Sequence, residues 1–464
     1  MLMLIPPLTI ILTCHPPYLR WLPAALRSID DQVPAAAERI LVCDGCRPER
    51  DSYAGWQLVS GAWGFAPAAR NAGMHASTAP WIVFWDADNI MAEGYIDALL
   101  RTINQIAENV AIIYPDIQFC DEDMRPRHYW ALPAWDYWGL RAENCIDTAS
   151  AWRRVALELA DGWAEERGLL DDYACALRVT AAGWQAIKLD GPPVLMRQHP
   201  DSTMHQRMRT DSLLTDIWRS RSLAIVSLLA GRTALFNRWL HFLQHAELPP
   251  RTALYIVDNS GQTEFRRMAF NACQELAARR GFTHLDFTSS GVPYQPDRDE
   301  HYLTRTRHLH IARLYAGLLP RVPEDLVLTL EDDITPPLDA IRHLGAEIGY
   351  RSRRNIGVVA AAYALPHCPD EEVCAGYGDE TWHATVRWEH LRDEPCDVGF
   401  VGGGCTVWAN WALRTSPLYL DWDATLGWDG VVCRALRRNG YAIRLHAGVR
   451  CEHELTGRVR GVEH

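Results

Sequence analysis

The sequence lacks a long apolar segment and an excess of basic residues, and both absences narrow its possible functions. No apolar run approaches the roughly 20 residues that a membrane-spanning helix needs, so we expect any membrane association to be peripheral. Lysine and arginine together number 46 against 58 acidic residues, which gives a formal net charge of −12. Because duplex-binding proteins usually carry a basic surface, this balance disfavours nucleic acid as a partner without excluding a local basic groove.

A disulfide framework and a signal peptide are also missing. The thirteen cysteines are scattered and odd in number, which favours a reducing compartment, and we expect a cytoplasmic protein. The N-terminus is apolar, but its first basic side chain is Arg20, and Pro6 and Pro7 interrupt it. This segment therefore predicts a first β-strand rather than a secretion signal.

Short apolar runs alternate with amphipathic stretches along the first half of the chain. This alternation predicts an α/β fold with a mostly parallel sheet covered on both faces. The expected strands are residues 8–13, 39–43, 81–85 and 110–114, and the expected helices are residues 19–31, 66–77 and 93–108.

The same order then starts again in the second half. The interval from Arg70 to Asp88 is close to that from Arg313 to Asp333, and other pairs repeat in the same way. Repeated intervals indicate two copies of one fold, and 464 residues suit two domains. We predict an N-terminal domain over residues 1–218 and a C-terminal domain over residues 219–464. The expected elements of the second half are strands 222–229, 252–257, 326–330 and 356–362 and helices 236–245 and 308–319.

An acidic triplet follows the third expected strand. Asp86 and Asp88 flank one alanine in a turn at the carboxyl end of a strand, where α/β proteins place ligands. Two such carboxylates suit Mg²⁺ or Mn²⁺, which also binds the diphosphate of a sugar nucleotide. Acidic turns after strands are common and are usually solvated, so this motif alone is a weak indication of a metal site.

Two further motifs accompany the triplet. Asp44 and Gly45 end the second strand, where a carboxylate suits a nucleobase or ribose, although Asp-Gly is also typical of turns. Arg70, within Ala-Arg-Asn-Ala-Gly, opens the helix before the acidic strand and would reach phosphates or hold the acidic loop. By itself, Arg70 is better explained as a surface arginine on an amphipathic helix.

Together and in this order, these motifs resemble the nucleotide-binding half of the family 2 glycosyltransferases of GT-A fold. The resemblance runs from Leu8 to about Leu100 and returns at Trp152 and at Asp171 and Asp172. It implies a nucleotide-sugar site with a divalent metal, and a helix-borne carboxylate as the catalytic base. The implied roles are nucleotide-sugar binding by Thr13, Asp44, Arg70 and Asp86, metal binding by Asp88 and His199, and base catalysis by Asp172 with Asp171 as the second choice.

The second half resembles the same family more distantly. Gly402 to Gly404 would let the backbone approach a sugar closely. The resemblance implies nucleotide-sugar binding by Asp258, Arg313 and Glu331, metal binding by Asp333 and His453, and base catalysis by Asp429.

Aromatic residues lie between the metal motif and the expected base, where an acceptor would bind. Trp130, Trp135 and Trp138 belong to this group, and Trp428 takes the matching place in the second half. Aromatic faces suit sugar rings, but packing in the core is at least as consistent with these side chains.

The resemblance implies inverting transfer of a sugar, with UDP-sugars favoured as donors, to a hydroxyl acceptor. One hypothesis is a bifunctional enzyme with one site in each domain. Another keeps one catalytic domain beside a carbohydrate-binding or scaffolding domain. A sugar nucleotidylyltransferase is disfavoured because the segment from Thr13 to Pro17 is not a glycine-rich phosphate loop. A nonenzymatic carbohydrate-binding protein is disfavoured by the two acidic constellations. Saccharide acceptors rank above modified DNA bases.

Overall fold

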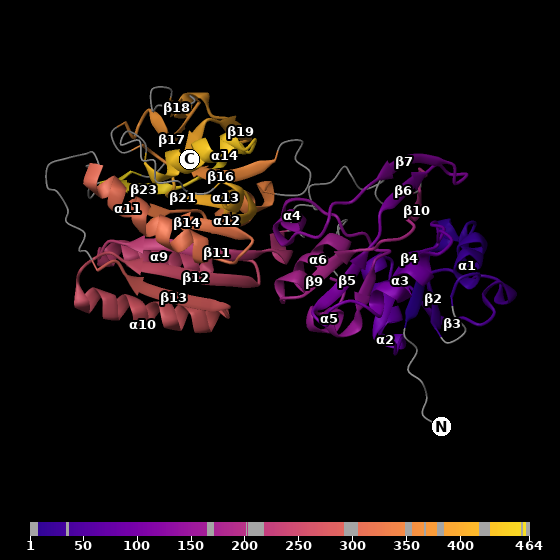
Figure 1. Cartoon of the computed structure of the whole chain (residues 1–464). Helices are drawn as coiled ribbons and strands as arrows, with labels where there is room; N and C mark the ends of the chain where they lie inside the picture. The colour runs from indigo at the N-terminus through magenta and orange to yellow at the C-terminus, as the bar shows by residue number, and fades with distance from the viewer. Residues whose placement is uncertain are drawn as a thin grey trace. The chain divides into compact units, whose positions relative to one another are not determined.

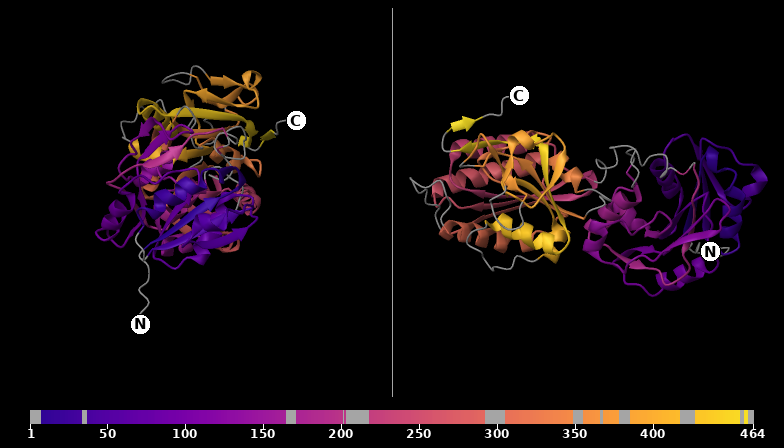
Figure 2. Two further views of the ribbon diagram at one scale, coloured as in Figure 1. Left: turned by 90° about the vertical axis from the view of Figure 1, so that its right-hand side faces the viewer. Right: turned by 90° about the horizontal axis from the view of Figure 1, so that it is seen from above.

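The computed structural model describes residues 8–33, 37–164, 171–200, 202, 218–291, 305–348, 355–365, 368–377, 385–416, 427–455 and 458–460. The chain divides into two compact units, residues 1–216 and 217–464. The expected division at residue 218 lies two residues from this boundary, in a stretch that is largely outside the described residues. Figures 1 and 2 show helices packed against the sheet of each unit.

The N-terminal unit is built on a seven-stranded sheet with the order β3-β2-β1-β4-β8-β5-β9. A separate three-stranded sheet has the order β10-β6-β7. The strands are β1 (Thr9–Cys14), β2 (Glu38–Asp44), β3 (Gln57–Gly61), β4 (Trp81–Asp86), β5 (Val110–Tyr114), β6 (Ile117–Cys120), β7 (Pro126–Trp130), β8 (Ala151–Arg153), β9 (Gln185–Lys188) and β10 (Val194–Arg197). The helices are α1 (Leu22–Asp30), α2 (Ala66–Ala76), α3 (Tyr95–Ile103), α4 (Tyr137–Ala142), α5 (Arg154–Leu159) and α6 (Asp171–Ala181).

The C-terminal unit has an eight-stranded sheet with the order β13-β12-β11-β14-β21-β16-β22-β19 and two three-stranded sheets, β15-β23-β24 and β18-β17-β20. Its strands are β11 (Ser222–Leu229), β12 (Arg251–Asp258), β13 (His284–Ser289), β14 (Leu326–Leu330), β15 (Ile334–Thr335), β16 (Ile356–Ala362), β17 (Glu372–Gly376), β18 (Thr385–Arg387), β19 (Pro395–Val398), β20 (Phe400–Val401), β21 (Cys405–Ala409), β22 (Ala442–Arg450), β23 (Glu452–Leu455) and β24 (Arg458–Arg460). Its helices are α9 (Thr233–His245), α10 (Thr263–Arg280), α11 (Arg305–Leu318), α12 (Ala340–Glu347), α13 (Asn410–Thr415) and α14 (Trp428–Arg438).

The two large sheets share one topology. In the first, β1 runs parallel to both β2 and β4, and β8 is antiparallel to both of its neighbours. In the second, β11 runs parallel to β12 and β14, and β21 is antiparallel to both of its neighbours. Strand β19 is an addition at the edge of the second sheet. The α/β class with mostly parallel sheets is confirmed.

Strand register gives residue equivalences between the units. Trp152 pairs with Ile82 in the first sheet, and Trp408 pairs with Val327 in the second. Counting the same distance along β4 and β14 makes Glu331 equivalent to Asp86 and Asp333 equivalent to Asp88. The same comparison through β2 and β12 makes Asn259, rather than Asp258, equivalent to Asp44.

The glycine of the Ala-Arg-Asn-Ala-Gly motif has a packing role. Helix α2 lies against β1 and β2. A Cβ atom on Gly73 would come within 2.5 Å of Cγ2 of Ile11 and 2.9 Å of Cγ2 of Val42. A side chain at this position would therefore push the helix away from the sheet, and with it Arg70, which precedes the glycine by less than one turn.

Two further expectations concern disulfide bonds and membrane-spanning helices. All thirteen cysteines are free thiols. Within the described residues, no helix combines the length and the apolar character that crossing a bilayer requires.

Candidate functional site

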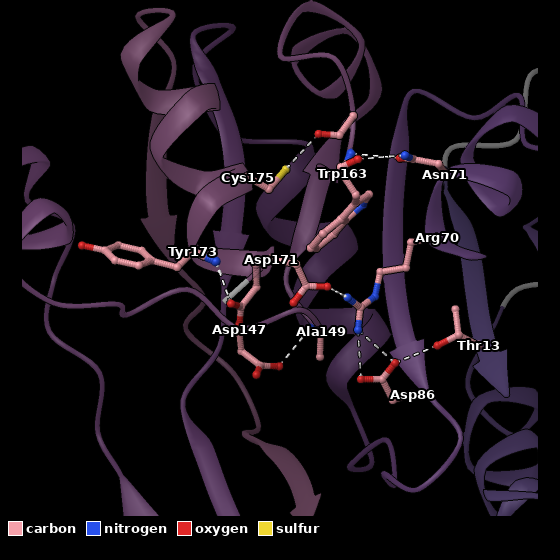
Figure 3. Close-up of polar contacts among 12 residues, drawn as sticks. Thr13, Arg70, Asn71, Asp86, Asp147, Ala149, Trp163, Asp171, Tyr173 and Cys175 are labelled. Atoms are coloured by element: carbon pink, nitrogen blue, oxygen red, sulfur yellow. Dashed lines mark hydrogen bonds and ion pairs between the residues drawn. The ribbon is translucent and has the colours of Figure 1, made fainter. Parts of the chain in front are cut away.

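Arg70 joins two acidic elements at the carboxyl edge of the first sheet (Figure 3). One guanidinium nitrogen lies 3.3 Å from Oδ1 of Asp86, at the end of β4, and another is paired with Asp171, the first residue of α6. The hydroxyl of Thr13, on β1, donates to the same Oδ1 of Asp86 at 2.7 Å. Three of the residues expected to bind the nucleotide sugar are therefore in contact, together with one of the two expected acids of α6.

The guanidinium of Arg70 is buried. The residue is only 4% exposed, and its Cζ atom lies 4.8 Å from the centroid of the Trp163 ring. Burial opposes its charge, but the carboxylates of Asp171, Asp86 and Asp172 outweigh burial and raise the pKa of Arg70 above its ordinary value. Arg70 is thus a fixed internal cation and not a surface arginine.

Asp88, two residues after Asp86, is in contact with His199. Nε2 of His199 lies 3.1 Å from Oδ2 of Asp88, and the two residues are 4% and 7% exposed. The His199 ring packs against Trp21, with a centroid separation of 4.2 Å. Arg197 of β10 donates from Nε to the backbone oxygen of Asp88 at 2.8 Å, which ties the acidic turn to the strand that precedes His199.

The two facing atoms of this pair, Nε2 of His199 and Oδ2 of Asp88, are ligand types that a divalent cation accepts. Oδ1 of Asp88 is in addition buried without a hydrogen-bond partner. Burial raises the pKa of Asp88 and His199 opposes that rise, as expected for a carboxylate that would be stabilised by more positive charge. Among the described residues, no group of three or more His, Cys, Asp or Glu side chains surrounds one point as a complete metal site. Mg²⁺ commonly takes one or two protein carboxylates and completes its coordination with phosphate oxygens and water, so a pair of protein ligands is compatible with a shared site.

The two expected base residues begin helix α6. Asp172 accepts a hydrogen bond from Nδ2 of Asn144 at 3.4 Å. Its burial and the neighbouring Asp171 and Asp147 raise its pKa well above the usual range for aspartate. A carboxylate with a raised pKa binds a proton more strongly, which suits a general base that takes a proton from a hydroxyl.

Asp147 is a site residue that the sequence interpretation missed. It lies in the loop before β8, and Figure 3 shows its contact with the backbone at Ala149. Its Oδ1 accepts from the backbone nitrogen of Ala149 at 2.9 Å. Burial is the main cause that raises the pKa of Asp147 to about 6, and the negative charge of Asp86 adds to the rise. No sequence motif contains Asp147, because only the fold of its loop brings this residue to the site.

The carboxylate of Asp44 accepts hydrogen bonds from backbone groups of its own unit. Its Oδ1 accepts backbone hydrogen bonds from Trp63 at 2.7 Å and Gly64 at 3.0 Å, in the loop after β3. These bonds fix that loop next to the end of β2. A contact between Asp44 and a base stays a prediction.

The expected acceptor residues of the first unit are half-buried rather than part of the core. Trp130 ends β7 and stacks with Phe119 at a centroid separation of 6.4 Å, and Trp138 lies on α4 edge-on to Tyr137 at 5.0 Å. Trp135 lies in the connection between these elements and is also half-buried. Each therefore keeps part of its ring accessible, as a sugar-binding role requires.

The second unit differs where Arg70 stands in the first. Counting back from β14 as from β4 places Tyr315 at the position of Arg70, whereas Arg313 is exposed on α11. Tyr315 is buried and stacks on Trp428 with ring centroids 3.9 Å apart. Trp428 is 5% exposed, so its ring is packed inside this unit.

The acids of the second unit are also close together. Burial, Asp333 and Asp429 raise the pKa of Glu331 to about 8. Oδ2 of Asp429 accepts from the backbone nitrogen of Gly403 at 3.0 Å. A Cβ atom on Gly403 would lie 2.4 Å from the Trp428 ring, so a tryptophan fills the space that we expected for a sugar.

Arg232 holds the acidic triplet of this unit, and sequence interpretation missed it. Its guanidinium is paired with Asp332 and lies 3.1 Å from Oδ2 of Asp333. Of the other expected residues, Asp258 pairs with Arg266 at 2.7 Å, away from the triplet. His453 lies opposite Ile334 in the β15–β23 pair, and its Nδ1 is 2.8 Å from the backbone oxygen of Ala364.

Comparisons with known proteins agree with the architecture of the first unit. Residues 10–159 match the family model described as Glycosyl transferase family 2, which confirms the resemblance over this stretch. Among curated proteins, none matches the chain significantly.

Solved structures of S. aureus TarS are similar to part of the chain at low identity. The structure of TarS 1–349 in complex with UDP-GlcNAc is 12% identical over 46% of this chain and 64% of that one, with a TM-score of 0.38. The structure of TarS is 12% identical over 45% of this chain and 38% of that one, with a TM-score of 0.35. The chain thus spans less than two thirds of the length of these proteins.

Proposed function

We propose that the N-terminal unit transfers a sugar from a nucleoside diphosphate donor to an acceptor hydroxyl, with the help of a divalent cation. One observation carries the proposal: Arg70 joins the acidic turn of β4 to the acidic start of α6, beside the Asp88–His199 pair. This arrangement lies within and next to the stretch that matches family 2 glycosyltransferases.

Asp88 and His199 would hold the cation, which is Mn²⁺ or Mg²⁺. When bound, the cation stabilises negative charge on the departing diphosphate. Thr13 and Asp86 would bind the nucleotide part of the donor, and UDP-sugars are the favoured class. The UDP-GlcNAc named for the TarS structure is compatible with this donor class.

Asp172 would act as the general base. Its carboxylate removes the acceptor proton as the hydroxyl oxygen attacks the anomeric carbon, and the nucleoside diphosphate leaves from the opposite face, which inverts the configuration. Arg70 fixes Asp171, the neighbour of the base, and adds positive charge next to Asp86. Asn144, which donates to Asp172, orients the carboxylate.

The acceptor would bind against the half-buried rings of Trp130, Trp135 and Trp138. Aromatic faces favour a saccharide, and the acidic net charge of −12 disfavours DNA. A cytoplasmic location is compatible with the thirteen free thiols.

The bifunctional arrangement is the second candidate. The equivalence of Glu331 and Asp333 with Asp86 and Asp88, together with Asp429 at the start of α14, supports it. The stacked Tyr315–Trp428 pair at the Arg70 position favours the alternative, in which the C-terminal unit binds carbohydrate or acts as a scaffold. Activity that survives Asp333→Asn but is lost in Asp88→Asn would select the alternative.

A donor screen tests the main proposal. The full chain is incubated with a panel of nucleotide sugars and Mn²⁺, with and without saccharide acceptors, and release of nucleoside diphosphate is measured. We expect release from at least one donor, loss of release on chelation of the metal, and loss in Asp88→Asn. Absence of release from every donor would contradict the proposal.

A further inference from the structure

The acidic triplet of the C-terminal unit has a cation of its own. The side chain of Arg232 comes from the connection between β11 and α9 and contacts both Asp332 and Asp333. The Arg232 side chain is 40% exposed, and a guanidinium stays protonated throughout the physiological pH range, so the cation beside the triplet carries a permanent charge. A second oxygen of Asp332 accepts from the backbone nitrogen of Ala230 at 3.2 Å, which ties the triplet to the same connection.

The first unit has no such arginine. The strand register that makes Thr9 equivalent to Ala224 places Pro17 at the position of Arg232. In that unit Asp88 instead faces His199 and keeps Oδ1 buried without a partner. The two units thus differ in what faces the same carboxylate: a histidine in one and a guanidinium in the other.

A guanidinium in this place works against a divalent cation. Arg232 lies 3.1 Å from Oδ2 of Asp333, which is the oxygen that a cation would need for bidentate or bridging coordination. A cation bound to the remaining Oδ1 would lie a few ångströms from a fixed positive charge, and like charges at that distance repel. His453 does not remove this repulsion: its Nδ1 donates to the backbone oxygen of Ala364, which leaves Nε2 as a possible ligand, but a neutral imidazole brings no negative charge.

We propose that the guanidinium of Arg232 takes the place of a divalent cation in the C-terminal unit, so that the chain binds one such cation, at Asp88. The single-cation count rests on the proposed function of the N-terminal unit, whereas the role of Arg232 does not. The triplet of the second unit is then an internally neutralised version of the metal site of the first.

The matching residues around the triplet agree with this assignment. Tyr315 and Trp428 stack where the first unit has the Arg70–Asp171 ion pair. Arg232 is the cation that lies against the triplet. Removal of its charge leaves Oδ1 of Asp333, already buried without a hydrogen bond, free to join Oδ2 in binding a metal ion.

The test is a count of bound Mn²⁺ on the full chain in the presence of UDP, by the loss of the electron paramagnetic resonance signal of free Mn²⁺. Wild type is expected to bind one ion and Asp88→Asn none. Arg232→Gln is expected to bind two ions, and Arg232→Gln combined with Asp333→Asn one. Arg232→Lys, which keeps the charge, is the matched control and is expected to bind one. Circular dichroism and melting temperature check that each variant is folded.

Three outcomes separate the inference from the function on which the count rests. Two ions in wild type, falling to one in Asp333→Asn, would overturn the inference. An unchanged count in folded Arg232→Gln would overturn it as well. No ion in wild type but one in Arg232→Gln would support the role of Arg232 and refute the metal site at Asp88.

Discussion

Nε2 of His199 lies 3.1 Å from Oδ2 of Asp88, although one residue follows β10 and the other follows β4. The contact depends on the small β10-β6-β7 sheet, because Arg197 of β10 hydrogen-bonds the backbone of Asp88 and brings the end of the strand to the acidic turn. His199 is held further by the rings of Trp21 and Tyr18. The pair is therefore preorganised, and ligands fixed before a cation arrives lose little entropy on binding it.

Replacing His199 tests its role as a metal ligand. We expect His199→Gln to weaken Mn²⁺ binding by about 10- to 100-fold, because a substituted ligand or supporting residue commonly has an effect of this size. Isothermal titration with Mn²⁺ and UDP measures the change. His128→Gln, an exposed histidine on β7, is the control and should bind Mn²⁺ as wild type does. Equal affinities in the two variants would remove His199 from the site.

The two acids of α6 should separate in kinetics. Asp172→Asn removes the proposed base, and we expect kcat to fall by about 10²- to 10⁴-fold with little change in the KM for donor. Asp171→Asn weakens the ion pair with Arg70, so we expect a lower melting temperature and a higher KM for donor. Steady-state rates with the best donor of the screen measure both. A larger loss of kcat in Asp171→Asn would exchange the two roles.

Arg70 should matter for stability as well as for binding. Arg70→Gln leaves Asp86 and Asp171 without their buried partner, and breaking such a pair costs about 3–5 kcal/mol. Urea denaturation measures the free energy of unfolding. Arg313→Gln is the control, because that arginine is exposed, and exposed substitutions usually change stability by no more than about 0.5 kcal/mol. A comparable loss in both variants would argue that Arg313 has a structural role matching that of Arg70.

Gly73→Ala should destabilise the protein, although alanine has a higher helix propensity than glycine. Alanine in a helix interior is favoured over glycine by about 1 kcal/mol, but the added Cβ would lie 2.5 Å from Ile11, and overpacking costs about 1–3 kcal/mol. Gly317→Ala on α11 is the control, since no atom lies within 4 Å of its added Cβ. We expect a lower melting temperature for the first variant and an equal or higher one for the second. A rise in both would refute the close packing of α2 on the sheet.

Asp147 should give stability a dependence on pH. Its pKa of about 6 in the folded protein is higher than the ordinary aspartate value of 3.8. Between these two values the folded state binds more protons than the unfolded state, so the stability that this residue contributes falls as pH rises from about 4 to 6.

The variant Asp147→Asn removes that dependence and keeps the Oδ1 acceptor for the Ala149 nitrogen. We therefore expect its melting temperature relative to wild type to increase between pH 4 and pH 7, which differential scanning calorimetry measures. A constant difference over this range would show that Asp147 titrates at its ordinary pKa.

Much of the architecture follows from local patterns in the chain. The expected strands 110–114, 222–229, 326–330 and 356–362 coincide with β5, β11, β14 and β16, because buried strands of parallel sheets are short, continuous apolar runs. The expected helices agree with α1, α2, α3, α9 and α11 to within five residues at their ends, where capping and fraying decide the boundary, whereas α10 was not expected. Strand β8 is only three residues long and is not among the expected strands.

The contacts of the site were less accessible to sequence reasoning. Asp86, Asp88 and Arg70 stand in motifs, so their proximity followed from strand order. Asp147 and Arg232 stand in loops without a motif, and their positions depend on how those loops fold back. The choice of Arg313 over Tyr315 had a specific cause: we expected an arginine at the repeat position, whereas an unchanged count from the strand leads to a tyrosine.

Trp152 and Trp408 hold the same register in the two sheets, each fully buried on the antiparallel strand between two parallel ones. The chain carries two versions of the same sheet topology, so the two units can be compared residue by residue. The two tryptophans are a feature that both units share. The units differ at other positions, such as Arg70 against Tyr315, and swapping these residues one at a time would show which exchanges change the activity of each unit.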